Sequence, residues 1–175
     1  KDLSAGNYQV QMRPTSLSDT STSTAIVQTP EEPWVKVFDV AIEARARRFR
    51  PPLLIQRVKA KFGDAFQLEG YKLEPSKLQR GTEAQLTVYW RALQEPQQIY
   101  AAFNHLRLDD STIVWQEDSW PQAGIHTTDH WLEGEVVGET YTLSLPDDLE
   151  PGVYKLYTGL YDPVTGERLV CTDSK

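Results

Sequence analysis

Three histidines are the residues of this sequence best suited to metal binding or acid–base chemistry. His126 and His130 are four residues apart with Asp129 between them, a spacing that can bind zinc when it lies on a helix. Proline, glycine and threonine residues surround the pair and predict a loop, so we expect structural histidines here. His105 lies within an alternating apolar segment, which indicates a hydrogen-bonded strand residue.

Aspartates on expected loops are a second group with chemical potential. Four of them could offer calcium the hard oxygen ligands that it prefers: Asp109, Asp110, Asp118 and Asp129. Asp118 with Asp109 or Asp129 could also stand at the separation that a glycosidase needs. Nothing in the sequence brings two of these carboxylates to one cleft. Calcium is therefore kept as a candidate cofactor, beside the alternative that these are solvated acidic loops.

Residues for nucleophilic catalysis are not assembled in this sequence. Cys171 is the single cysteine, which excludes an internal disulfide framework, and it has no partner motif nearby. No serine stands in a nucleophile elbow, and no glycine-rich loop could hold a phosphate. We therefore expect this chain not to be an enzyme by itself.

The aromatic residues are the most suggestive candidates for ligand contact. Trp115, Trp120 and Trp131 fall within 17 residues, and tryptophans on a β-sandwich can stack on the apolar faces of sugar rings. The alternative is that Trp90 and Trp115 fill the core, while Trp120 and Trp131 fix the loop over residues 119–137 onto a sheet. Both interpretations remain open, and a sugar ligand would be expected at Trp120 and Trp131, with Trp115 nearby.

β-Strands are the elements that must position these residues. Period-2 alternation, bounded by Gly, Pro and Asp turns, predicts strands over residues 7–13, 35–43, 54–60, 65–73, 85–91, 99–106, 140–145 and 154–160. Gly70 inside one of these strands indicates a bulge. A short helical extension is expected over residues 43–49. The pattern predicts an all-β protein, an antiparallel Ig-like β-sandwich with an N-terminal strand extension.

Composition and charge narrow the class of function. The 175 residues carry a net charge of −7 with a pI near 5.0, which argues against a nucleic-acid binder. Seven basic and no acidic residues lie from Arg45 to Lys61, whereas eleven acidic and no basic residues lie from Leu108 to Tyr154. The basic stretch could contact lipid headgroups or a phosphorylated ligand, or it could be a solvated linker that ends at Pro51-Pro52.

A weak internal repeat bears on the domain organisation. Leu3-Ser-Ala-Gly6-Asn-Tyr8-Gln-Val10 matches Leu149-Glu-Pro-Gly152-Val-Tyr154-Lys-Leu156 in its Leu, Gly, Tyr and last aliphatic positions. We therefore expect residues 1–52 to be the end of a preceding similar module, packed on the sandwich of residues 53–175 or swapped into a second copy as a strand-swapped homodimer. The start at Lys1, without a methionine or a signal peptide, is expected of a piece of a longer polypeptide.

Several motifs between Phe62 and Leu169 carry a family resemblance. In chain order they are Phe62-Gly-Asp64, Leu68-Glu-Gly-Tyr71-Lys-Leu73, Leu86-Thr-Val-Tyr-Trp90, Tyr100-Ala-Ala-Phe103-Asn-His105-Leu106, Gln116-Glu-Asp118, Trp131-Leu-Glu-Gly134-Glu-Val-Val137, Pro151-Gly152-Val-Tyr154 and Gly159-Leu160-Tyr161-Asp162. This series resembles the soluble β-sandwich module at the C-terminus of polytopic bacterial membrane glycosyltransferases, of the 4-amino-4-deoxy-L-arabinose transferase-like and mannosyltransferase-like kinds. Glu133 and Glu139 depart from the proline and aspartate usual in that family.

The resemblance implies a context and no active site. It implies a non-catalytic accessory module on the extracytoplasmic face of the membrane, which serves glycan contact, substrate presentation or assembly. Its partners would be a glycan and the membrane-embedded remainder of the same polypeptide, where the glycosyltransferase chemistry would reside. The alternatives are a free-standing carbohydrate-binding module, with or without calcium, and a structural repeat of a surface protein.

Overall fold

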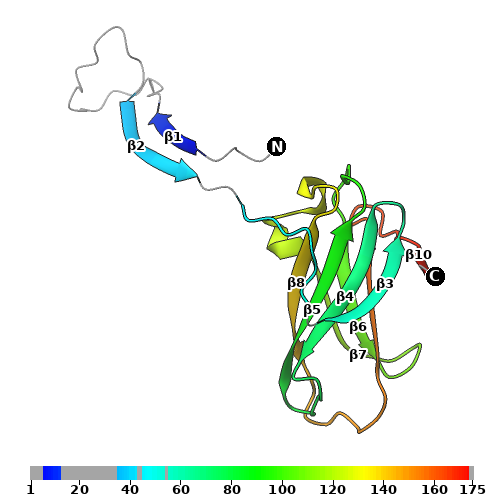
Figure 1. Ribbon diagram of the computed structural model, residues 1–175. Helices are drawn as coiled ribbons and strands as arrows, with labels where there is room; N and C mark the ends of the chain where they lie inside the picture. Colours follow the sequence, from blue (N-terminus) through cyan, green and yellow to red (C-terminus); the bar gives the residue numbers. More distant parts are fainter. Residues whose placement is uncertain (1–5, 13–34, 43–44, 54, 174–175) are drawn as a thin grey trace. The chain divides into compact units, whose positions relative to one another are not determined.

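The computed structural model describes residues 6–12, 35–42, 45–53 and 55–173 (Figure 1). The chain divides into two compact units, Lys1–Ala46 and Arg47–Lys175, which are described separately here. The division falls six residues before the boundary expected at residue 52. The physical reason is that the segment after Ala46 is bonded to the second unit: the Val136 N–H donates to the Arg48 carbonyl at 2.7 Å, and the Arg91 guanidinium donates to the Phe49 carbonyl.

The described part of the first unit is a β-hairpin. Strands β1 (Gly6–Met12) and β2 (Val35–Ile42) pair antiparallel with Tyr8 opposite Val40, which confirms both strand predictions. Leu3, and with it the start of the repeat motif, lies outside the described residues. The helix expected over residues 43–49 is not formed at residues 45–49, which have no regular secondary structure.

The second unit is an antiparallel β-sandwich, as the alternation predicted. One sheet has the order β10-β3-β4-β5-β8 and the other β7-β6-β9 (Figure 1). The strands are β3 (Gln56–Phe62), β4 (Phe66–Glu74), β5 (Glu83–Ala92), β6 (Ala101–Arg107), β7 (Ile113–Ser119), β8 (Val136–Ser144), β9 (Lys155–Tyr161) and β10 (Cys171–Asp173). Two short 3-10 helices, η1 (Pro121–Gly124) and η2 (Thr128–His130), lie between β7 and β8. No helix among the described residues has the length and apolarity needed to cross a membrane.

The alternation of apolar and polar residues did not predict strand β7. Its sequence ends in four polar residues and keeps no apolar alternation, because β7 is an edge strand whose side chains are at most half-buried. It pairs only with β6, the strand that precedes it, through the turn between Arg107 and Ile113.

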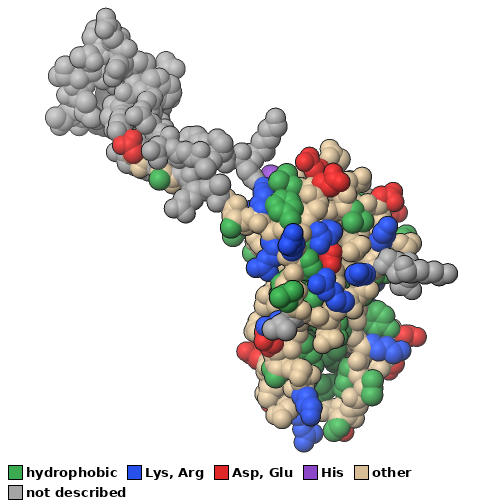
Figure 2. Space-filling view, in the orientation of Figure 1, with side chains coloured by type: hydrophobic (Ala, Val, Ile, Leu, Met, Phe, Trp, Pro, Cys, Tyr) green, Lys and Arg blue, Asp and Glu red, His purple; other side chains and the backbone are tan. Residues whose placement is uncertain are grey.

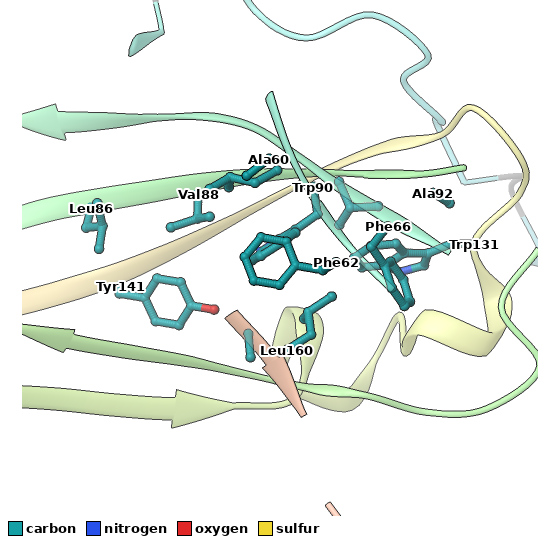
Figure 3. Close-up of a cluster of buried hydrophobic side chains, with 13 residues drawn as sticks. Ala60, Phe62, Phe66, Leu86, Val88, Trp90, Ala92, Trp131, Tyr141 and Leu160 are labelled. Atoms are coloured by element: carbon teal, nitrogen blue, oxygen red, sulfur yellow. The ribbon is translucent and has the colours of Figure 1, made fainter. Parts of the chain in front are cut away.

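Buried side chains from both sheets form the main core, and its buried aromatic residues come from the five-stranded sheet and from Trp131 (Figure 3). Trp90 is buried, as expected, and meets Phe62 edge to face with 5.1 Å between ring centroids. Trp131 meets Phe66 in the same way at 5.8 Å. Edge-to-face pairs of this kind add to the stabilisation from burial itself.

A tyrosine corner begins strand β9. The Tyr154 hydroxyl donates to the Glu150 carbonyl, four residues upstream, at 2.5 Å, where the chain crosses from β8 to the other sheet. This corner is typical of Ig-like sandwiches. It gives a physical meaning to the Gly-x-Tyr spacing of the repeat at Gly152 and Tyr154, whereas Gly6 and Tyr8 of the other copy lie inside β1.

The strand pairings on both sides of β4 are irregular near Gly70. The register shifts between Arg57 and Ala60 in β3, and the β4–β5 pairing shifts between Leu68 and Gly70, which confirms the bulge expected at Gly70. A Cβ at Gly70 would lie 2.1 Å from the Gln56 carbonyl oxygen, and the residue has φ +151°. Only glycine permits this close approach of β3 to β4.

Gly70→Ala is therefore expected to destabilise the sandwich by about 2–3 kcal/mol, since it forces the paired backbones apart and strains φ. Urea unfolding followed by tryptophan fluorescence measures this loss. Gly152→Ala is the matched control, because its φ is ordinary and the nearest atom to an added Cβ is 3.6 Å away. Equal stability of the two variants would contradict the close approach at Gly70.

The buried phenol of Tyr141 is expected to make the sandwich less stable at alkaline pH. Burial is the main cause that raises the pKa of its phenol from 10.0 to about 12. Above pH 10 the unfolded chain loses this proton while the folded chain keeps it, so stability falls between about pH 10 and 12. Tyr141→Phe should remove about 2–3 kcal/mol of that pH-dependent loss, measured as the difference in unfolding free energy between pH 9 and pH 12. An unchanged alkaline loss in Tyr141→Phe would contradict the assignment.

Candidate binding cleft

An apolar cleft opens between the two sheets at the end that carries the β4–β5 and β8–β9 loops. Its volume is about 880 Å³, within the size range of ligand sites. Aliphatic side chains of both sheets line it, among them Leu68, Leu86, Val88, Leu106, Leu143 and Leu156. Figure 2 shows a hollow with hydrophobic side chains in its floor at this end of the sandwich.

The charges of the cleft lie at its loops rather than in its interior. Among the described residues that line it, only Arg80 and Glu150 are charged, and both are exposed. Such a lining can bind apolar groups by the hydrophobic effect. The lining residues that the structure describes do not bring together a nucleophile, a base and a residue that orients the base.

The cleft is open because the two sheets differ in size. Strand β9 ends the three-stranded sheet, opposite a sheet of five strands. Apolar side chains beneath that edge, Leu73, Leu149 and Tyr154, are only half-buried. A further strand beside β9 would cover them.

Backbone groups of β9 face this open edge. The Leu160 carbonyl accepts a hydrogen bond from the Leu169 N–H at 2.8 Å, on the side away from β6. Residues of an antiparallel strand alternate between groups that face one neighbour and groups that face the other, and the β6–β9 register has no shift. The N–H and C=O groups of Leu156 and Thr158 therefore point to the open edge, where no described strand pairs with them.

The three candidate tryptophans have different surroundings. Trp120 is 44% exposed, whereas Trp131 is 1% exposed and lies in the core. Trp115 is half-buried and packs against both core clusters. The expectation that Trp131 stacks on a sugar is therefore wrong, because its ring is covered and its indole N–H donates to the His126 carbonyl at 3.0 Å. The alternative interpretation, in which Trp131 fixes the loop, agrees with this position.

The four candidate calcium ligands do not come together. Among the described residues, no group of three or more His, Cys, Asp or Glu side chains could hold a metal ion. Asp109 instead accepts hydrogen bonds from the hydroxyl and N–H of Ser111 and from Thr112. These bonds, with the Ser111 hydroxyl foremost, lower the pKa of Asp109 to about 2.

The other three aspartates each contact different residues. Asp118 contacts the His105 ring at 3.3 Å across the β6–β7 pair, Asp129 accepts from the Thr127 hydroxyl at 2.6 Å, and the Asp110 carbonyl accepts from Arg107. The calcium site expected from Asp109, Asp110, Asp118 and Asp129 is therefore a wrong prediction for the described residues. The carboxylates of Asp109 and Asp129 accept hydrogen bonds within their own loops, and that of Asp118 contacts the neighbouring strand β6.

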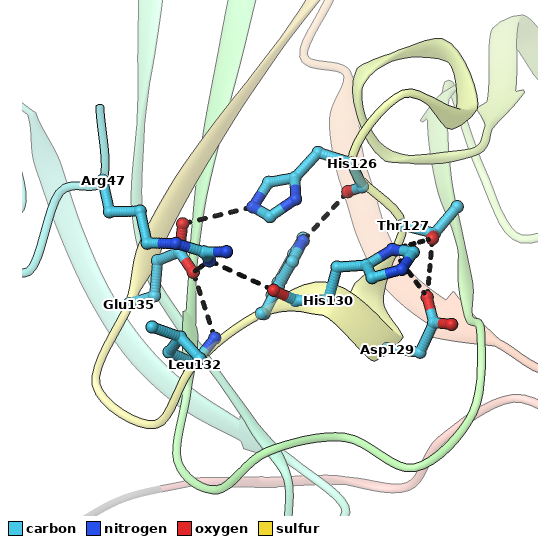
Figure 4. Close-up of polar contacts among 8 residues, drawn as sticks. Arg47, His126, Thr127, Asp129, His130, Leu132 and Glu135 are labelled. Carbon is cyan, nitrogen blue, oxygen red and sulfur yellow. Dashed lines mark hydrogen bonds and ion pairs between the residues drawn. The ribbon is translucent and has the colours of Figure 1, made fainter. Parts of the chain in front are cut away.

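A buried polar network centres on Glu135, which the sequence analysis did not single out (Figure 4). Its carboxylate accepts from the His126 ring at 3.1 Å and from the Leu132 N–H at 3.0 Å, and it forms an ion pair with Arg47. Arg47 also donates to the His130 carbonyl. Glu135 and His126 are 3% and 2% exposed. The network anchors the loop between β7 and β8 to the start of the unit, so its role is structural.

One signal in the sequence could have pointed to Glu135. It belongs to the Trp131-Leu-Glu-Gly134-Glu-Val-Val137 motif, where it is followed by two valines of an expected strand. The sequence does not show that His126 and Arg47 converge on it.

Comparison of the chain with protein family models, with curated proteins and with solved structures finds no match.

Proposed function

We propose that this chain is a non-catalytic assembly module, which accepts an extended polypeptide strand along the open edge of β9. The observation that carries the proposal is the combination of outward-facing backbone groups at Leu156 and Thr158 with an apolar cleft directly beneath them. Strand addition uses both features: backbone hydrogen bonds supply affinity, and pockets for alternate side chains supply specificity.

The first unit supports this choice of occupant. Strand β1 contains the Gly-x-Tyr spacing that precedes β9 in the second unit, and β1 is paired along its length with β2. A strand of the β2 kind, with Val, Phe and Ile among its residues, suits the edge of β9 in the same way. A sugar or a metal ion would use neither the backbone edge nor the aliphatic lining.

The resemblance supplies the proposed setting. In that setting the module stands on the extracytoplasmic face of the membrane as an accessory part of a glycosyltransferase, and the strand comes from a neighbouring part of the same polypeptide or from a second copy. The module then holds parts of the larger protein together.

Amide hydrogen exchange tests the proposal on the full chain. In dilute protein, the Leu156 and Thr158 amides should exchange at least tenfold faster than the Tyr157 amide, which faces β6. A synthetic peptide with the β2 sequence, Val35–Ile42, should slow both amides, whereas the same peptide N-methylated at alternate residues should not. Protection of Leu156 and Thr158 that rises with protein concentration would identify a second copy as the source of the strand. Protection that neither concentration nor the peptide changes would overturn the proposal.

A second candidate function is glycan contact at Trp120. This side chain is 44% exposed at the end of β7, and an exposed indole can stack on a sugar ring. Titration with bacterial surface glycans, followed by tryptophan fluorescence, tests it. A response that persists in Trp120→Ala would exclude this residue as the contact.

A further inference from the structure

We infer that the outer face of the β3–β4–β5 region binds the phosphate headgroups of an anionic lipid surface. Arg50, Arg57, Lys59 and Arg91 line a surface pocket of about 750 Å³ around a single carboxylate, Glu69. The pocket has an excess of three positive charges on a chain whose net charge is −7. Figure 2 shows Lys and Arg side chains gathered over these strands. This site is separate from the strand edge of β9 and does not depend on it.

Glu69 orients two of the four cations. It is 3% exposed, forms an ion pair with Arg91, and accepts from Arg57 at 3.3 Å and from the Gln67 amide at 3.1 Å. Arg91 also donates to the Gly134 carbonyl at 2.9 Å. A guanidinium has five N–H donors, so Arg57, with one donor engaged in this way, keeps others for a phosphate oxygen. The buried Glu69 carboxylate thus fixes the positions of Arg57 and Arg91, and its single negative charge leaves the pocket with a net positive charge.

Strand β3 and the segment before it supply the other cations of the pocket. Lys59 has φ +59°, an uncommon conformation for a residue with a side chain. The shifted register leaves four consecutive exposed residues, Gln56 to Lys59, where a regular strand would turn every second side chain inward. Arg57 and Lys59 are two residues apart on this strand and both line the pocket, which Arg50 joins from the segment before β3.

Apolar residues beside the cations favour a lipid surface over a soluble phosphate. Leu53 lines the pocket and is 92% exposed, and nearby Phe49 is 49% exposed. Basic residues attract the anionic leaflet, and exposed apolar side chains enter the boundary between headgroups and acyl chains. A site built for a soluble anion gains nothing from an exposed leucine.

Vesicle flotation of the full chain tests the inference. The chain should bind vesicles of phosphatidylcholine with 30 mol % phosphatidylglycerol, and should not bind pure phosphatidylcholine vesicles. The double variant Arg50→Gln/Lys59→Gln leaves the Glu69 pairs intact and should weaken binding about 30-fold, from roughly fivefold per basic residue. The matched control Lys77→Gln/Arg168→Gln removes the same charge from two exposed positions that line neither the pocket nor the cleft, and should change binding less than twofold.

The outcomes separate the alternatives. Equal binding to both kinds of vesicle, or equal losses in the two double variants, would overturn the site. Inorganic phosphate is the soluble probe: if it shifts the Gln67 side-chain amide resonance while vesicles do not bind, the ligand is a soluble phosphate compound and the lipid assignment is wrong. Leu53→Ser should lower vesicle affinity roughly tenfold, and an unchanged affinity would overturn the apolar part of the inference.

Discussion

Glu135→Ala is expected to lower the free energy of unfolding by about 3–5 kcal/mol, the cost of removing one partner of a buried ion pair. The Arg47 guanidinium, the His126 ring and the Leu132 N–H all bond to this carboxylate. Without it, three polar groups lose an acceptor in a place where water has little access. Urea unfolding followed by tryptophan fluorescence measures the loss.

Glu133→Ala is the matched control for this prediction. Glu133 is two residues away, exposed, and forms no hydrogen bond or ion pair with the described residues. Its removal should change the unfolding free energy by less than about 0.5 kcal/mol. If the two variants unfold at the same urea concentration, the network around Glu135 does not stabilise the fold and its buried position needs another explanation.

Trp131→Ala should cost about 3–5 kcal/mol, because it removes a side chain that fills the core between Phe66 and the β7–β8 loop. The same change at Trp120, which is exposed, should alter the unfolding free energy by less than about 0.5 kcal/mol. Both variants exchange the same tryptophan side chain for the same alanine methyl group. The difference between their unfolding free energies therefore reports how deeply each tryptophan is buried.

Glycan titration of the same two variants adds a second measurement. A Trp131→Ala protein that is as stable as the parent but has lost glycan affinity would contradict the structural role of Trp131. Loss of affinity in Trp120→Ala with unchanged stability would support the second candidate function.

Local patterns of residue type are sufficient to predict the class of fold. Alternation of apolar and polar residues is a local signal with a period of two, and it predicted β3, β4, β5, β6, β8 and β9 near their observed positions. Glycine at residue 70 signalled the bulge, since a Cβ there would meet the backbone of the paired strand. The Leu-x-x-Gly-x-Tyr spacing marked the start of β9, where Tyr154 closes its corner on Glu150.

Which of the candidate residues meet depends on how the strands pack against one another. Trp120 and Trp131 are eleven residues apart and look alike in sequence, yet one is exposed and the other lies in the core. Arg91 joins Arg50 and Arg57 because β5 lies beside β4, which pairs with β3. Such contacts depend on which strands are neighbours and which faces turn inward. These are consequences of packing between segments far apart in the chain, so no local pattern of residue types contains them.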